Sequence, residues 1–305
     1  MITFKAKTES GEIIKSAISD FIFPAGEAHI KVEPKRSIEK TEIAIIQPSA
    51  DSLHDDLFKL AMWNDYLYTK PNTDAVLILP YFPGARADRI SPGVEEPFGL
   101  GVYAEFISNL TLKQVIIFDP HSSATETVLQ GEFPELTVVE SHELFSQPWI
   151  EMQIRANYSG IIAPDKGAVE RASAVADVLG LPVYTAEKKR DPETGKLTGF
   201  SVDLPDKNEA GFTNYFLIVD DICDRGGTFL GLVEASGLEF GRIDLFVSHG
   251  VFSSDAIKIL PEKFEQIWTT NSYNPNRELN DPDIEDWANV FTRFDVIHLL
   301  LEKVI

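Results

Sequence analysis

Three carboxylates and a pair of glycines stand close together in the second half of the chain, directly after four apolar residues at 216–219. An apolar run of this kind is typical of a strand that is buried on both faces of a parallel sheet. Such sheets bind ligands at the carboxyl ends of their strands, where the polar residues would lie. In chain order these residues are Asp220, Asp221, Asp224, Arg225, Gly226, Gly227 and Thr228.

The end of this segment is suited to a phosphate group. Gly226 and Gly227 lack a Cβ atom, so their backbone N–H groups can approach an anion closely, and Thr228 adds a hydroxyl donor. Residues 228–236 are predicted to form a helix, whose N-terminus attracts negative charge. The carboxylates would repel a phosphate unless they face sugar hydroxyls or a divalent cation. The segment therefore predicts a site for a phosphorylated sugar.

A second group of polar residues follows the apolar run at 75–79. Arg86 and Arg89 offer planar donors that suit a polyphosphate or a carboxylate. The alternative is a solvated loop in which the arginines pair with Asp88. Glu96 and the segment Asp119-Pro-His121 come later in the same half of the chain and favour a binding site.

The elements that position these residues are predicted from alternating apolar runs and stretches of helical spacing. Strands are expected at 42–46, 75–79, 114–118, 160–163, 182–185, 216–219 and 243–247, and helices at 53–68, 99–110, 166–179 and 228–236. This alternation predicts an α/β fold with parallel sheets. We expect two domains, residues 1–148 and 149–305, with the last strand packing back on the first domain. Residues 191–208 are predicted to form a long loop or a hairpin.

Composition narrows the class of protein. The chain has 305 residues, 44% of them apolar, which is enough for two domains with cores of their own. Its net charge of −21 argues against nucleic acid or an anionic membrane as a partner. With Cys223 as its single cysteine and with no apolar run of membrane-spanning length, the chain is expected in a reducing compartment, the cytoplasm.

The segment from Asp220 to Thr228 resembles the phosphoribosyl diphosphate motif of type I phosphoribosyltransferases and ribose-phosphate diphosphokinases. Over nearly its whole length the chain is similar to a ribose-phosphate diphosphokinase. The segment from Tyr81 to Arg89 resembles that family's Tyr-x-x-Ala-Arg-Gln-Asp-Arg, with one extra residue and Ala87 in place of Gln. Further segments that match are 23–27, 95–97, 119–121, 163–167 and 187–190.

This resemblance implies two tandem type I phosphoribosyltransferase-like domains and a role for each matching residue. The catalytic residues would be Lys188, Arg190 and His121. ATP would be bound by Phe23, Glu27, Arg86, Asp88 and His121. Ribose 5-phosphate would be bound by Arg190, Asp220, Asp221, Asp224, Arg225, Gly226, Gly227 and Thr228. A Mg²⁺ ion would be held at His121 and Asp165.

The implied reaction is Mg²⁺-dependent transfer of diphosphate from ATP to the anomeric hydroxyl of ribose 5-phosphate, which yields phosphoribosyl diphosphate and AMP. Catalysis would rest on cations and positioning, with no covalent nucleophile. The 191–208 segment would close as a lid. The resemblance also implies a homo-oligomer, a dimer or a hexamer, in which Phe23 and Glu27 reach a neighbouring subunit's adenine pocket.

Two other functions stay open at this point. A phosphoribosyltransferase acting on a nucleobase would share the second-half motif, although it gives the Arg86 and His121 segments no role. A non-catalytic regulatory homologue would explain three departures from the family pattern, Ala25, Ala87 and Arg225. Simpler interpretations also exist for single residues. His121 could cap a helix, Phe23 could be a core residue, and the cations at 188–190 could form a solvated charge run.

Overall fold

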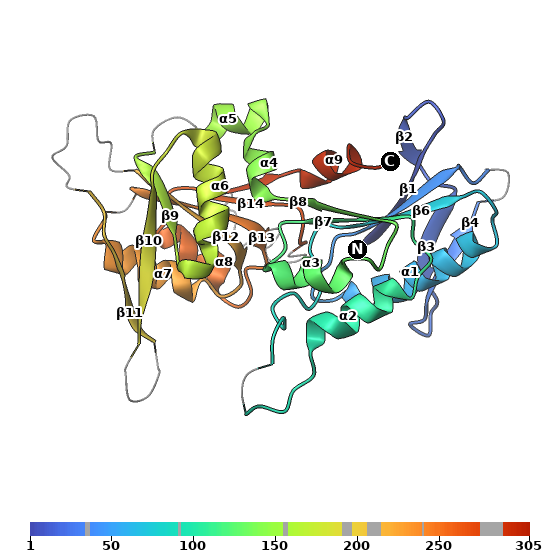
Figure 1. Cartoon of the computed structure of the whole chain (residues 1–305), viewed down its shortest axis with the longest axis horizontal. Helices are drawn as coiled ribbons and strands as arrows, with labels where there is room; N and C mark the ends of the chain where they lie inside the picture. The colour runs from blue at the N-terminus through green and yellow to red at the C-terminus, as the bar shows by residue number, and fades with distance from the viewer. Residues whose placement is uncertain are drawn as a thin grey trace. The chain divides into compact units, whose positions relative to one another are not determined.

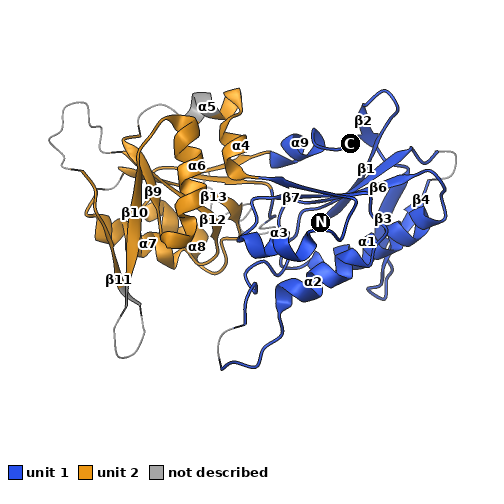
Figure 2. Cartoon of the chain, in the orientation of Figure 1, with its two compact units in different colours: residues 1–139, 272–274, 296–305 blue, residues 140–271, 275–295 orange. Residues whose placement is uncertain are grey.

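A computed structural model describes residues 1–33, 37–90, 93–154, 158–190, 197–205, 215–239, 241–274 and 289–305. The side chains at 151–153, 189–190 and 197–198 lie outside the described part. The chain divides into two compact units (Figure 2). Unit 1 comprises residues 1–139, 272–274 and 296–305, and unit 2 comprises residues 140–271 and 275–295.

Unit 1 is built on a six-stranded sheet with the order β2-β1-β5-β6-β7-β8 (Figure 1). The strands from β5 to β8 are parallel, whereas β1 and β2 are antiparallel to their neighbours. A separate hairpin pairs β3 with β4. The elements of this unit are β1 (Ile2–Lys7), β2 (Ile13–Lys15), β3 (Ile18–Ile22), β4 (Ala28–Val32), β5 (Thr41–Ile46), α1 (Leu53–Tyr68), β6 (Asp74–Leu79), α2 (Gly99–Ser108), β7 (Gln114–Phe118), α3 (Ser123–Leu129), β8 (Glu135–Val139) and α9 (Val296–Leu301).

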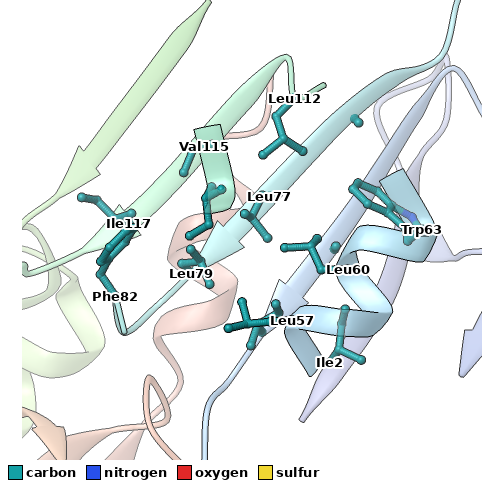
Figure 3. Close-up of a cluster of buried hydrophobic side chains, with 14 of the residues drawn as sticks. Ile2, Leu57, Leu60, Trp63, Leu77, Leu79, Phe82, Leu112, Val115 and Ile117 are labelled. Carbon is teal, nitrogen blue, oxygen red and sulfur yellow. The ribbon is translucent and has the colours of Figure 1, made fainter. Parts of the chain in front are cut away.

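The core of unit 1 lies between this sheet and the helices α1 and α2 (Figure 3). On α1, Leu57, Leu60 and Trp63 follow one another at helical spacing, so a single face of the helix is apolar and buried. They pack with Leu77 and Leu79 of β6. Burying an aliphatic side chain of this size stabilises the fold by about 1.5–3 kcal/mol. The core therefore fixes the strands whose carboxyl ends carry the polar segments.

Unit 2 is built on a seven-stranded sheet with the order β11-β10-β9-β12-β13-β14-β15. All its neighbouring strands are parallel except β10 and β11, which form an antiparallel hairpin. The elements of this unit are α4 (Ser141–Phe145), α5 (Pro148–Ile154), β9 (Gly160–Ala163), η1 (Lys166–Ala168), α6 (Val169–Leu179), β10 (Val183–Arg190), β11 (Leu197–Val202), β12 (Phe216–Cys223), α7 (Gly227–Ser236), β13 (Ile243–Gly250), α8 (Ala256–Ile259), η2 (Leu260–Glu262), β14 (Ile267–Thr270) and β15 (Phe291–Phe294).

Helices cover both faces of the unit 2 sheet. Alternate residues of β12 point to opposite faces, as in any strand. Phe216 and Ile218 belong to the apolar cluster that includes Phe229 and Leu232 of α7. Helix α6 packs against β9, β10 and β12. The alternation therefore assigns residues 216, 218 and 220 to the α7 side, and 217, 219 and 221 to the α6 side.

The α/β fold with mainly parallel sheets is confirmed, and each predicted strand and helix is present. The predicted strand at 216–219 was too short, because β12 runs on to Cys223. Beside it, β13 continues to Gly250 and offers pairing partners for Asp220, Ile222 and Cys223. The acid pair is therefore part of a strand rather than the loop after it.

Two further predictions concern the second half of the chain. The 191–208 segment contains β11, so the hairpin alternative is the observed one, although 191–196 and 206–208 lie outside the described residues. The last strand, β15, pairs with β14 in unit 2, and the helix that follows it, α9, belongs to unit 1. None of the helices in the described part of the chain has the length and apolar character that a membrane span needs.

Candidate functional site

Three neighbouring strands of unit 2 carry the polar residues predicted for a sugar phosphate. Strand β12 contains Asp220 and Asp221, β9 ends at Ala163 just before Asp165, and β10 contains Lys188. These strands are adjacent and parallel, in the order β10-β9-β12. The turn that follows β9, η1, also contacts β10 and β12. The carboxyl edge of one sheet thus brings together residues that are far apart in the sequence.

Asp165 and Lys188 form a close ion pair at this edge. The Lys188 Nζ atom lies 2.5 Å from Asp165 Oδ2. Asp165 Oδ1 also accepts hydrogen bonds from the backbone N–H groups of Gly167, at 2.8 Å, and Ala168, at 3.2 Å. Partial burial raises the pKa of Asp165, but Lys188 and the two N–H donors outweigh it and hold the pKa below its usual value. The aspartate is therefore charged and already paired with a cation.

The acid pair on β12 is unequally exposed. Asp220 is partly exposed, whereas Asp221 is buried. The Asp221 N–H donates a hydrogen bond of 2.9 Å to Asp220 Oδ1. Burial, and then the charge of Asp221, raise the pKa of Asp220 well above its usual value. Two adjacent carboxylates at a sheet edge can accept hydrogen bonds from neighbouring hydroxyls of one sugar.

Sequence reasoning missed Arg171, which lies beside this acid pair. Its Nη1 atom is 3.9 Å from Asp221 Oδ1, and both side chains are largely buried. The residue stands inside a predicted helix of mixed composition, where nothing in the pattern distinguished it. The one available signal was a cation near the start of that helix, where positive charge is unfavourable.

The turn after β12 has the shape expected of an anion cradle. Gly226 has a φ of 76° and stands immediately before α7, which begins at Gly227 and includes Thr228. A Cβ atom at Gly226 would lie 2.9 Å from Leu260 Cδ2, so a larger residue would have to displace that side chain. Arg225 is exposed. Gly226 is buried and Gly227 is exposed, so an anion could approach the N-terminus of this ten-residue helix at Gly227.

Ser253 is a second residue that sequence reasoning missed. Its Oγ atom donates a hydrogen bond to Asp224 Oδ1. Phe252 and Ser254 on either side have φ values of 44° and 57°, a left-handed backbone that few non-glycine residues adopt. Strained backbone of this kind clusters at functional sites. The loop after β13 therefore fixes the orientation of the third acid of the motif.

In unit 1 the predicted polar residues lie at the carboxyl ends of the neighbouring strands β6 and β7. Asp88 accepts a hydrogen bond of 2.7 Å from Ser122 Oγ, which ties the loop after β6 to the segment that contains His121. The same Ser122 Oγ accepts from the Ala124 N–H at the start of α3. Arg86 is exposed and His121 is partly exposed. The Arg89 Nε atom is 3.9 Å from Asp88 Oδ1.

Phe23 and Glu27 lie elsewhere in unit 1, in the turn between β3 and β4. This hairpin forms its own two-stranded sheet, separate from the one that carries Arg86 and His121. Phe23 is 42% exposed, so the interpretation as a core residue is wrong. Its ring contacts those of Phe21 and His29, with centroid distances of 4.8 and 5.6 Å. The turn therefore presents an aromatic surface and an exposed carboxylate to solvent.

Oxygen ligands that suit a hard cation are present, but they are few. Asp165 offers a charged carboxylate, which is the ligand type that Mg²⁺ prefers. No cluster of three or more His, Cys, Asp or Glu side chains with metal-binding geometry occurs among the described residues. A Mg²⁺ ion would therefore take most of its ligands from phosphate and water, as is usual for this ion. The side chain of Arg190 lies outside the described part, although its backbone belongs to β10.

Known proteins resemble this chain in both sequence and fold. Residues 148–237 match the phosphoribosyl transferase domain family. A ribose-phosphate pyrophosphokinase from Pyrococcus furiosus is 30% identical over 255 residues, which cover 82% of this chain and 84% of that protein. One from Brucella melitensis is 25% identical over 289 residues, covering 89% and 88%. The crystal structure of phosphoribosylpyrophosphate synthetase from Mycobacterium smegmatis superimposes with a TM-score of 0.73 at 21% identity, covering 94% of this chain and 89% of that one.

Proposed function

The chain belongs to the ribose-phosphate pyrophosphokinase family, and we propose that it transfers the intact diphosphate of ATP to the anomeric hydroxyl of ribose 5-phosphate. The products are phosphoribosyl diphosphate and AMP. The observation that carries the proposal is the arrangement in unit 2, where an acid pair, an anion cradle and the Asp165–Lys188 ion pair occupy adjacent strands and the turns that follow them.

We propose one orientation for ribose 5-phosphate at the carboxyl edge of the unit 2 sheet. Its 5-phosphate would accept hydrogen bonds from the backbone N–H groups of the 226–227 turn and from the Thr228 hydroxyl, at the positive end of α7. Its ring hydroxyls would donate to Asp220 and Asp221. Asp224, held by Ser253, would take part in orienting the sugar. In this orientation the phosphate would face hydrogen-bond donors and the diol would face hydrogen-bond acceptors.

Catalysis of this reaction depends on neutralising negative charge and needs no covalent nucleophile from the protein. The anomeric oxygen forms a bond to the β-phosphorus of ATP, the bond from that phosphorus to the α-phosphate oxygen breaks, and the hydroxyl proton is released. Negative charge grows on the phosphoryl oxygens and on the departing AMP. We propose that Lys188 and Arg190, which both belong to β10, offset this charge. Asp165 in unit 2 and His121 in unit 1 are each proposed as a ligand for Mg²⁺, which would supply further neutralisation of the phosphates.

The ATP contacts belong to unit 1. We assign the triphosphate to Arg86 and His121, with Asp88 orienting the loop through Ser122. Phe23 and Glu27 are exposed at a hairpin turn, which supports a role toward a second copy of the chain in a homo-oligomer. The lone cysteine, Cys223, supports a location in the reducing cytoplasm.

A single assay tests the proposal. Purified protein is incubated with Mg²⁺, ATP and ribose 5-phosphate, and the products are followed by phosphorus NMR. We expect AMP and phosphoribosyl diphosphate in equal amounts, and no AMP when ribose 5-phosphate is omitted. Unchanged ATP in the presence of folded protein would overturn the proposed activity.

The two alternatives predict different results when the assay is extended to other substrates. A phosphoribosyltransferase would release pyrophosphate from phosphoribosyl diphosphate only after a nucleobase is added. A regulatory homologue would bind ATP without turnover. The departures that favour it, Ala25, Ala87 and Arg225, are all exposed, so they change the surface and leave the core intact.

A further inference from the structure

Arg171 occupies a position that is unfavourable for a positive charge unless something nearby compensates it. It is the third residue of α6, where the partial positive charge of the helix N-terminus repels a cation. Its side chain is only 13% exposed, and arginine is rarely buried to this extent without a partner. Helix α6 packs against β9, β10 and β12, the three strands of the candidate site. A cation buried at this position calls for a charge of opposite sign nearby.

The compensating charge is Asp221. Along β12 the side chains alternate, so Asp221 lies on the same face as α6 and Asp220 on the face of α7. The Asp221 side chain is 5% exposed, and its Oδ1 atom lies 3.9 Å from Arg171 Nη1. This distance exceeds the 2.7–3.2 Å of a direct N–H···O hydrogen bond, so the contact is an electrostatic attraction. A buried carboxylate with a neighbouring carboxylate needs such a cation to stay ionised.

The influence of Arg171 also reaches Asp220. Burial and the charge of Asp221 raise the pKa of Asp220, and the positive charge of Arg171 acts in the opposite direction. Two carboxylates on adjacent residues repel each other. The positive charge of Arg171 therefore offsets part of this repulsion.

We propose that Arg171 is a positioning residue for the pentose site: it holds the Asp221 carboxylate in place as an acceptor for the sugar hydroxyls without contacting the sugar itself. This inference rests on the proposed function, because it assumes that ribose 5-phosphate is the ligand of the acid pair. It assigns a role to a residue outside the phosphate turn and outside β10.

The test compares Arg171→Met and Arg171→Lys with a matched control, Arg242→Met. Arg242 precedes β13 at the opposite edge of the same sheet, and its guanidinium lies 4.7 Å from the centre of the Tyr215 ring. We expect R171M to raise the KM for ribose 5-phosphate about tenfold and the KM for ATP less than about twofold. R171K keeps the charge and should recover to within about threefold of the wild type. R242M should leave both KM values unchanged.

A double-mutant cycle shows whether Arg171 acts through Asp221. Asp221→Asn removes the charge that Arg171 holds, so adding R171M to D221N should change the KM for ribose 5-phosphate by less than about twofold. If the two single effects multiply instead, Arg171 contacts the sugar phosphate directly and the positioning role is wrong. An unchanged KM in R171M would overturn the inference as well. Should R171M fail to fold, Arg171→Gln, which removes the charge but keeps a polar side chain, gives the same cycle alone and combined with D221N.

Calorimetric titration of ribose 5-phosphate without ATP separates this inference from the proposed function. If the wild type binds ribose 5-phosphate but forms no phosphoribosyl diphosphate, the activity is wrong, and weaker binding by R171M still supports the inference. If the wild type is active and R171M binds equally well, the inference is wrong and the activity stands. If the wild type neither binds ribose 5-phosphate nor forms phosphoribosyl diphosphate, both are wrong.

Discussion

The two units present their polar residues in different ways. In unit 2 the residues proposed for ribose 5-phosphate lie within β10 and β12, in the turn directly after β12 and at the start of α7, and Asp221 is buried. In unit 1 the residues proposed for ATP lie in the long connection between β6 and α2, in the segment after β7 and in the β3–β4 turn, and Arg86, Phe23 and Glu27 are exposed. Residues on strands are held more rigidly than residues on loops.

This difference indicates that the residues proposed for ribose 5-phosphate are preorganised, whereas the residues proposed for ATP depend on loops. Asp165 is already paired with Lys188, Asp221 with Arg171 and Asp224 with Ser253. In unit 1 the hydrogen bond from Ser122 to Asp88 joins one loop to the segment after β7. Substitutions in unit 2 should therefore affect sugar binding, stability or turnover, depending on the residue, whereas substitutions in unit 1 should affect mainly ATP binding.

The largest effect is expected for Lys188→Ala. If Lys188 offsets charge that grows only during the reaction, its loss should lower kcat about thousandfold and change the KM for ribose 5-phosphate less than about threefold. Steady-state kinetics measure both values. Lys263→Ala removes an exposed lysine of the same unit and should behave as the wild type. A kcat within about tenfold of the wild type would remove Lys188 from the charge-neutralising role and break the contrast between the units.

Asp220→Asn should separate binding from stability. Asn keeps one acceptor oxygen but replaces the other with an NH2 donor and removes the charge, which should raise the KM for ribose 5-phosphate about tenfold. The pKa of Asp220 is raised in the folded protein, so charging it favours the unfolded chain, and the folded wild type loses stability as the pH rises above about 4, the ordinary pKa. Asn carries no charge and avoids this loss.

The stability difference between D220N and the wild type should therefore depend on pH in a defined direction. Thermal unfolding without ligand should show equal Tm values near pH 4 and, at pH 7, a D220N Tm higher by about 2–4 °C. The same melts in saturating ribose 5-phosphate should favour the wild type. A Tm difference that shrinks as the pH rises would contradict the raised pKa of Asp220.

The sequence predicted the features that depend on local signals and missed those that depend on contacts between distant residues. The parallel strands and the glycine turn were predicted because apolar runs, glycines and acids are local signals, and β7 and β9 have the predicted bounds. Arg171 and Ser253 could not be predicted, because their partners Asp221 and Asp224 are distant in the chain and meet them only after the sheet forms. Strands β14 and β15 were among those missed, because each has only four residues and mixes apolar with polar side chains.

Gly226→Ala tests whether the phosphate turn is preorganised by its backbone. Alanine at a φ of 76° is strained, and its Cβ would meet Leu260 Cδ2 at 2.9 Å, so we expect a loss of about 1–3 kcal/mol in the free energy of unfolding. The displaced N–H groups should also raise the KM for ribose 5-phosphate about fivefold. Gly227→Ala is the stability control, since no atom lies within 4 Å of a Cβ there. Equal unfolding free energies for the two variants would show that the turn tolerates a side chain and is not rigid.

The smallest effect is expected in unit 1, for Ser122→Ala. This change removes the hydrogen bond to Asp88 and the cap of α3, so the loop after β6 loses its link to the His121 segment. We expect the KM for ATP to rise about threefold, with the KM for ribose 5-phosphate unchanged and a loss of about 1 kcal/mol in stability from the cap. Ser123→Ala is the matched control, because that side chain is exposed and the neighbouring Thr127 Oγ1 bonds to its backbone carbonyl. A rise in the KM for ribose 5-phosphate instead would mean that the loop after β6 also affects sugar binding. The proposed separation of ATP binding in unit 1 from ribose 5-phosphate binding in unit 2 would then be wrong.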